Sequence, residues 1–373
     1  MTRVPLPRLR LLARWILGAT VLIAACTRTP RGVGLGTSDA GDVGRPADGG
    51  PGSALIRSIG RAEDRRRAAD VPDEARTAHD PAVRRLAARA LARIGDATSE
   101  RSLLQALSDE DPQTAGWAAY GLGWACKGHE EAHVRALAAR AVALGVGAPV
   151  ARTVDEAGAA TATTIDPRLA LVRAVGRCGG ELAEQVLSAW VRARGGWAEG
   201  AALALGDIAG RKGQLADETA TALLDAASDP ELAVAVYPFA RVERIGDAVV
   251  PRVLKVARSV VARPAEARIF AIRALSRCGG DAAVDLLHVV ESKELTSAER
   301  AEAARGLKLL GEPGRASVAL ALGQLTPDKD PFAITALGGD DFGVLRTLVG
   351  SLGSADDAPS WNSKRPADQR RSS

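Results

Sequence analysis

The sequence DPAVRRLAARALARIG at residues 80–95 decides the fold, because its pattern returns along the chain. Asp caps the free backbone amides of a helix start, Pro suits the first helical position, and Gly closes a helix in the left-handed conformation. Each copy therefore predicts one helix. Copies that begin with Asp-Pro are residues 80–95, 111–126, 166–180, 229–246 and 330–339. Two further copies, residues 273–280 and 305–312, keep only the ending.

Tandem repetition of such a unit predicts a solenoid, in which each unit stacks on its neighbours. The first copy carries one apolar stripe at three- and four-residue spacing, made of Val83, Leu86, Ala87, Ala90, Leu91 and Ile94. A second helix is expected after each turn, over residues 99–107, 130–144, 181–191, 217–227, 249–262, 282–290 and 314–325. The predicted fold is all-α: a right-handed α-solenoid of about eight helix pairs over residues 53–352.

The composition agrees with this fold and narrows the function. Apolar residues make up 46% of the 373 residues, whereas aromatic residues make up 3%, which favours close-packed helices over sheets. The formal net charge is +4, but Arg3, Arg8, Arg10 and Arg14 all lie within residues 1–25, which hold no acidic residue. The remaining chain is formally neutral. A neutral chain is not expected to bind nucleic acid, because such binding depends on neutralising phosphates.

The first 26 residues have the features of an export leader. Four arginines precede an apolar run, residues 15–25, which is too short to cross a bilayer as a helix. Ile23, Ala24 and Ala25 then lead into Cys26. This ending resembles the lipobox of bacterial lipoproteins, whose cysteine is acylated after the leader is removed. A plain signal peptide and a buried hydrophobic helix with a chance cysteine are the alternatives.

The lipobox resemblance implies that residues 1–25 are a signal peptide and that acyl chains on Cys26 anchor the protein in a bacterial envelope membrane. Thr27 follows the cysteine. By resemblance to the enterobacterial sorting rule, the lack of Asp at this position favours the outer membrane, facing the periplasm.

Three segments lack a helical stripe. Residues 26–52 are rich in Gly and Pro and predict a disordered tether, and the polar residues 353–373 predict a disordered tail. Residues 145–165 interrupt the repeats. Long insertions of this kind are functional or disordered, and the Ala, Thr and Gly content favours disorder.

The repeats resemble HEAT repeats, and more closely the short HEAT-like repeats first described in phycobilin lyases. Only the repeat framework matches, so bilin attachment does not carry over. Residues 56–67, IRSIGRAEDRRR, also look like the opening of bacterial HEAT proteins that carry a C-terminal cyclophilin-type prolyl isomerase. The chain has no room for that domain after residue 350, so isomerase activity is not predicted.

Residues 129–133, HEEAH, match the H-E-x-x-H motif of zinc-dependent hydrolases. On a helix, His129 and His133 share one face and could bind Zn²⁺, with Glu130 as the general base. A third ligand is needed, and Asp155 and Glu156 are the nearby candidates. Acidic residues at an expected helix start also have a simpler role at its positive end. Catalytic zinc is therefore the minor alternative, and no cofactor is predicted.

The three cysteines after Cys26 predict buried free thiols that pack as small apolar residues. Cys178 and Cys278 occupy the same position of two repeats, three units apart. Layers about 10 Å apart place them beyond the reach of a disulfide. Cys126 lies near the turn of the preceding unit and is expected to be a poor partner as well.

Two aromatic residues are candidates for binding a partner. Tyr120 and Trp124 replace Arg89 and Arg93 of the first unit, on the face opposite the apolar stripe. Exposed aromatic residues four apart on a helix suit a docking site, since Trp and Tyr dominate interface hot spots. Packing beneath the insertion at residues 145–165 is an equally open alternative.

Together these observations predict a non-catalytic scaffold or adaptor for envelope or periplasmic proteins, anchored to the bilayer through Cys26, with no nucleic-acid partner. Solenoids offer extended binding surfaces. The alternatives are a zinc-dependent hydrolase at residues 129–133 and an accessory or remnant of a periplasmic prolyl-isomerase system.

Overall fold

The protein is all-helical. The computed structural model describes residues 51–147, 166–264, 266–314, 317–318, 320, 325 and 331–338, and these residues contain helices and no strand. The predicted all-α solenoid is confirmed. None of the described helices is long and apolar enough to cross a bilayer. The leader, Cys26, the tether, the tail and residues 148–165 of the insertion lie outside the described residues.

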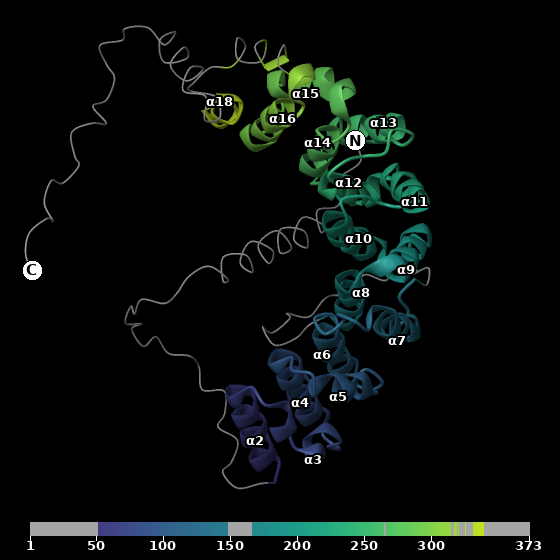
Figure 1. Cartoon of the computed structure of the whole chain (residues 1–373), viewed down its shortest axis with the longest axis vertical. Coiled ribbons are helices and arrows are strands. Elements are labelled where there is room, and N and C mark those ends of the chain that lie inside the picture. Colours follow the sequence, from purple (N-terminus) through teal and green to yellow (C-terminus); the bar gives the residue numbers. More distant parts are fainter. Residues whose placement is uncertain are drawn as a thin grey trace, which may run out of the picture. The chain divides into compact units, whose positions relative to one another are not determined.

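The chain divides into two compact units, residues 1–278 and residues 279–373. In the first unit the longer helices alternate between two layers (Figure 1). The first layer contains α2 (Pro51–Arg65), α4 (Pro81–Ile94), α6 (Pro112–Leu122), α8 (Pro167–Cys178), α10 (Ala198–Lys212), α12 (Tyr237–Arg241) and α14 (Arg268–Leu275). The second layer contains α5 (Ser99–Ala106), α7 (Glu130–Ala143), α9 (Gly180–Arg192), α11 (Asp217–Ala227) and α13 (Val250–Val261). Every first-layer helix packs on the next one along the chain.

The connection from α2 to α4 contains two short helices, η1 (Ala68–Asp70) and α3 (Asp73–Arg76). The second unit contains η3 (Gly279–Ala282), α15 (Ala283–Glu291), α16 (Ser297–Leu309) and α18 (Pro331–Gly338). There α15 packs on α16, and α16 packs on α18.

The Asp-Pro pairs start helices as predicted. A side-chain oxygen of each Asp accepts a hydrogen bond from a backbone N–H of the first turn at Asp80, Asp111, Asp166 and Asp229. At the other end of α4, Gly95 has φ of 64°, a conformation that costs glycine little because it has no Cβ. The local signals read from the sequence therefore place these helix starts correctly.

Two units depart from the prediction. The copy at residues 229–246 is not one continuous helix, because Pro238 lacks an N–H and its ring blocks a helix that would run through it. A 3₁₀ segment, η2 (Pro230–Val236), comes first, and α12 ends at Arg241, before Gly246. Helix α10 is not preceded by Asp-Pro and has no counterpart among the copies found in the sequence.

Small residues let first-layer helices approach one another closely. A Cβ at Gly176 of α8 would lie 2.7 Å from Cβ of Ala204 in α10, and one at Gly206 would lie 2.2 Å from Cε1 of Tyr237. No side chain fits at either position without a shift of the neighbouring helix. The core between the layers consists mainly of Ala, Leu and Val side chains. The side chains of the first layer that point away from this core form an outer surface.

Candidate functional site

Trp124 and Tyr120 lie on the surface of the first layer, at the end of α6. The Trp124 side chain is 66% exposed, whereas Tyr120 is half-buried. The Tyr120 ring makes an edge-to-face contact with Trp117, with ring centroids 6.0 Å apart. Trp residues are enriched at interface hot spots, so an exposed Trp beside a Tyr is a candidate contact point for a partner. Partner binding at Tyr120 and Trp124 stays a prediction.

An arginine of the next first-layer helix holds these two rings. The Arg177 guanidinium carbon lies 4.5 Å from the centroid of the Trp124 ring and 5.1 Å from that of the Tyr120 ring. Both distances are typical of cation–π contacts. The contact fixes three side chains that would otherwise be free to move, so a partner would lose little entropy by ordering them.

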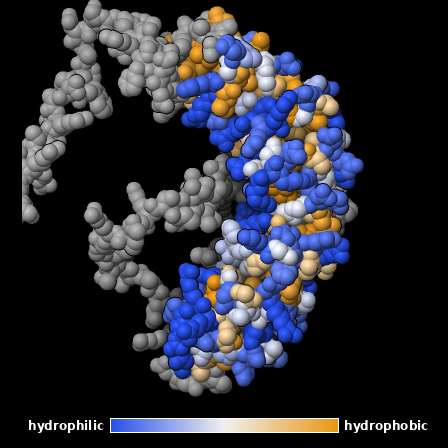
Figure 2. Space-filling view, in the orientation of Figure 1, coloured by the Kyte–Doolittle hydropathy of each residue, from blue (hydrophilic) through white to orange (hydrophobic). Residues whose placement is uncertain are grey.

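The same surface continues along the first layer through α8, α10, α12 and α14. We call it the arginine–aromatic stripe, and its members are Tyr120, Trp124, Arg173, Arg177, Asp207, Arg211, Tyr237, Arg241, Arg273 and Arg277. Tyr237 and Phe270 of adjacent helices add an edge-to-face pair with centroids 4.9 Å apart. Asp207 is the carboxylate among these stripe residues. Hydrophilic residues dominate the face of the molecule in Figure 2, and hydrophobic residues occur there in scattered groups.

Partial desolvation already affects the charges of the stripe. Burial lowers the pKa of Arg173, Arg177 lowers it further, and Asp207 opposes the change. Burial also lowers the pKa of Arg177, against the influence of Tyr120 and Asp207. Guanidinium groups nevertheless stay protonated at neutral pH. Arg173 and Arg177 are therefore cations whose hydration is partly reduced.

The H-E-x-x-H residues do not share one environment. His129 is exposed and precedes the first residue of α7, whereas His133 is buried, with 1% of it exposed. The Glu130 carboxylate accepts a hydrogen bond from Gly128 N at 3.0 Å, which lowers its pKa. The two imidazole rings stack with centroids 5.9 Å apart. The suggested third ligands, Asp155 and Glu156, lie outside the described residues, so zinc binding by this motif stays a prediction.

The cysteines correct the sequence-based expectation. Cys126 and Cys178 form a disulfide, with Cα atoms 5.2 Å apart, and are not free thiols. Helices α6 and α8 are neighbours in the first layer. Cys178 is the last residue of α8 and Cys126 lies in the turn that follows α6, so the two cysteines meet side by side. The repeat pattern places the units of Cys126 and Cys178 next to each other. The distance argument from the sequence concerned Cys178 and Cys278, which are three units apart. Cys278 is buried, as predicted, and it is not in a disulfide.

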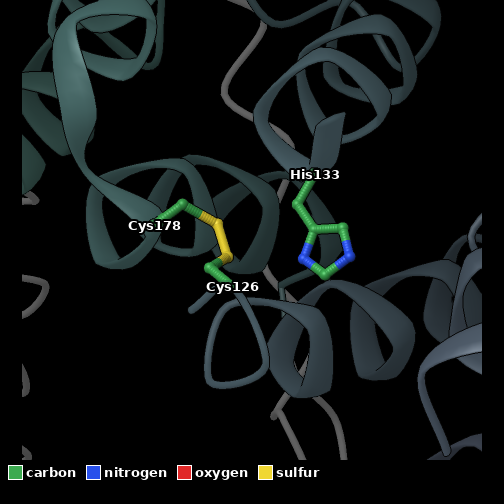
Figure 3. A group of neighbouring side chains, drawn as sticks. All are labelled: Cys126, His133 and Cys178. Atoms are coloured by element: carbon green, nitrogen blue, oxygen red, sulfur yellow. A yellow bond between two sulfur atoms is a disulfide. The ribbon is translucent and has the colours of Figure 1, made fainter. Parts of the chain in front are cut away.

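The disulfide has a buried imidazole beside it. One donor atom of each of Cys126, Cys178 and His133 lies within 4.8 Å of the other two, and all three residues are buried. We call these residues the sulfur–imidazole cluster (Figure 3). It joins the turn between α6 and α7, the first half of α7 and the end of α8, and Cys178 is the member that is distant in the sequence. Sequence reasoning considered His133 with His129, and it missed the sulfur atoms because they come from other helices.

Comparison with known proteins supports the repeat assignment. Residues 68–143 match the family described as HEAT repeats. None of the curated proteins compared with the chain matches it. Among solved structures, the crystal structure of an engineered protein from the Northeast Structural Genomics Consortium is similar, with 17% sequence identity and a TM-score of 0.36 over 81% of this chain and 85% of that chain. The HEAT-repeat match indicates a protein-interaction scaffold, a kind of fold that is typically non-catalytic.

Proposed function

We propose that the chain is a lipid-anchored scaffold of a bacterial envelope that binds an acidic segment of a partner protein along the arginine–aromatic stripe. The observation that carries the proposal is Arg177, held against Trp124 and Tyr120 at the α6–α8 end of the row of arginines. The stripe residues include six arginines and one carboxylate, and two further carboxylates, Glu199 of α10 and Glu266 before α14, lie near enough to interact with each other. A segment rich in Asp and Glu, with a few apolar side chains, is complementary to this surface.

A protein partner fits the stripe better than a nucleic acid does. The chain beyond residue 25 is formally neutral, so it offers a long polyanion no overall electrostatic attraction. Arg and aromatic residues are also the side chains that most often dominate protein interfaces. The HEAT-repeat match over residues 68–143 covers α4, α5, α6 and α7, and of the stripe residues it includes Tyr120 and Trp124.

Anchoring in the envelope is the second part of the proposal. It rests on the leader and on Cys26, and the Cys126–Cys178 disulfide supports it, because disulfides persist in oxidising compartments outside the cytosol. Fractionation of cells that produce wild type or Cys26→Ser tests this part. We expect wild type in the membrane fraction, with acyl chains visible by mass spectrometry, and the variant in the soluble fraction. A variant that stays in the membrane fraction contradicts the anchor.

Proximity labelling from the protein in its native cell tests the scaffold. We expect enrichment of a small set of envelope proteins that share an exposed acidic segment. Tyr120→Ala/Trp124→Ala should lower that enrichment at least 10-fold, and Arg173→Glu/Arg177→Glu should abolish it. Val142→Ala is the matched control, since Val142 is 61% exposed on the second-layer helix α7. Unchanged enrichment with both stripe variants, or a polynucleotide as the main bound species, contradicts the proposed function.

A further inference from the structure

The sulfur–imidazole cluster contains a buried nitrogen atom that has no hydrogen-bond partner. Nε2 of His133 lies 2.9 Å from Oε1 of Glu100. An ionised carboxylate only accepts hydrogen bonds, so Nε2 carries a proton, and in the neutral imidazole Nδ1 then has the lone pair. Nδ1 is buried and has no hydrogen-bond partner. Leaving a buried acceptor in this state costs free energy, and a disulfide has no proton to offer it.

The lone pair faces the two sulfur atoms. In Figure 3 the ring nitrogen next to the carbon that joins the imidazole to its side chain lies on the side of Cys126 and Cys178, and the other nitrogen points away from them. The first of these nitrogens is Nδ1. Its position is the one expected for a third donor beside two thiolates, and the three donor atoms lie within 4.8 Å of one another.

We propose that the reduced cluster is a zinc site in which Sγ of Cys126, Sγ of Cys178 and Nδ1 of His133 bind Zn²⁺. Thiolate sulfur and imidazole nitrogen are the donors that zinc prefers in proteins, and three protein donors leave a fourth position for water or another ligand. Two thiolates neutralise the ion, so the site is buried without net charge at the metal. This site uses His133 but neither His129 nor Glu130.

Glu100 completes the arrangement from the far side of the imidazole. A histidine that binds a metal through one nitrogen commonly donates the other N–H to a carboxylate, which orients the ring and strengthens its lone pair. Glu100 is in the first turn of α5 and keeps 27% of its side-chain surface exposed. Its hydrogen bond is therefore a positioning contact for the metal ligand, made from a helix that holds none of the three ligands.

The disulfide is the metal-free form of the same site. A thiol reductant passes two electrons and two protons to the Cys126–Cys178 bond and becomes a disulfide itself. Zn²⁺ then replaces the two thiol protons as two Zn–S bonds and one Zn–N bond form. Oxidation of the two cysteines by a disulfide of a redox partner reverses the sequence and releases the ion. The site links metal binding at the junction of α6, α7 and α8 to the thiol redox state.

The full chain after leader removal tests the site directly. The protein is reduced with a phosphine under argon, treated with a chelator, mixed with one equivalent of Zn²⁺ or Co²⁺, and passed through a desalting column. We expect one metal ion per chain by mass spectrometry, and a cobalt spectrum with thiolate charge-transfer bands. The oxidised protein, treated in the same way, should retain less than one tenth of an equivalent. This comparison needs no variant.

Substitutions separate the proposed site from its alternatives. Cys178→Ser and His133→Asn should abolish retention of the ion, whereas Cys278→Ser removes the other buried thiol and should leave it at one equivalent. Glu100→Gln should weaken Zn²⁺ binding about 10–100-fold without removing the thiolate bands. Circular dichroism at 222 nm verifies that each variant is folded.

Three outcomes overturn the proposal. The first is a folded, reduced wild type that retains no Zn²⁺ or Co²⁺, which would leave a redox-active cysteine pair without metal. The second is retention that survives Cys178→Ser. The third is retention that is lost in His129→Ala, which would assign the ion to the H-E-x-x-H pair. None of these results bears on the arginine–aromatic stripe, so this inference and the proposed function can fail separately.

Discussion

Two neighbouring junctions of the first layer, α4 with α6 and α6 with α8, are held together by different interactions. Between α4 and α6, the buried Arg84 binds Asp109 through two nitrogens and also donates to the carbonyls of Ala78 and His79. Arg85 binds Asp111, the residue that caps α6. Between α6 and α8, a disulfide takes the place of these ion pairs. The first junction should respond to acid, and the second to reductant.

The largest effect should come from Arg84→Met at the first junction. The side chains of Arg84 and Asp109 are 10% and 11% exposed, so the substitution leaves a buried carboxylate without its cation. Losses of roughly 3–5 kcal/mol are typical when one partner of a buried pair is removed. Urea unfolding followed by circular dichroism measures the loss. A loss below about 1 kcal/mol would mean that this junction does not depend on charge.

Breaking the disulfide should have the next largest effect. Cys126 and Cys178 are 52 residues apart in the sequence, and opening a loop of this size costs about 2–4 kcal/mol in folding free energy. Phosphine should therefore lower the thermal midpoint of wild type when a chelator is present. It should not change that of Cys178→Ala, which has no bond to reduce.

Cys278→Ala is the matched variant for this experiment. It removes a buried sulfur atom that is not in a disulfide, so the protein should still respond to phosphine. If wild type is indifferent to phosphine, the second junction is held by packing alone.

Acid should act on the first junction through Asp111. Burial raises the pKa of this carboxyl, but hydrogen bonds from Arg85 and Thr114 outweigh burial and lower it from 3.8 to about 2. The stabilisation is complete above pH 4 and is lost as the pH falls toward 2. The shift corresponds to roughly 2 kcal/mol. Asp111→Asn should therefore flatten the decline in unfolding free energy between pH 4 and 2. An equally steep decline in that variant would assign the acid response to other groups.

The smallest effect should come from Arg135→Ala, on the exposed face of α7 beside the second junction. Arg135 and Glu131 form an ion pair whose side chains are 70% and 68% exposed. Pairs of this kind contribute about 0.3–0.5 kcal/mol on a helix. The change in unfolding free energy should be at the limit of a urea titration. A loss above 1 kcal/mol would show that surface charge also supports this junction.

Local hydrogen bonding explains which parts of the fold were predictable. An Asp side chain and a Pro ring act on backbone groups within three residues, so helix starts such as Asp80 and Asp166 could be read directly from the sequence. The unit at residues 229–246 was misread because the effect of Pro238 competes with an otherwise regular apolar pattern. Helix α10 was missed because Trp197 and Ala198 stand where Asp and Pro begin other units.

The candidate sites were predictable only in part. The outward positions of Tyr120 and Trp124 follow from helical periodicity, but the position of Arg177 between their rings depends on how α8 lies against α6. The sulfur–imidazole cluster draws its residues from the turn after α6, from α7 and from α8, and its positioning residue, Glu100, comes from α5. Helical periodicity concerns residues within one helix, whereas the distance between two helices depends on packing across the whole interface. Small residues such as Gly176 set that packing.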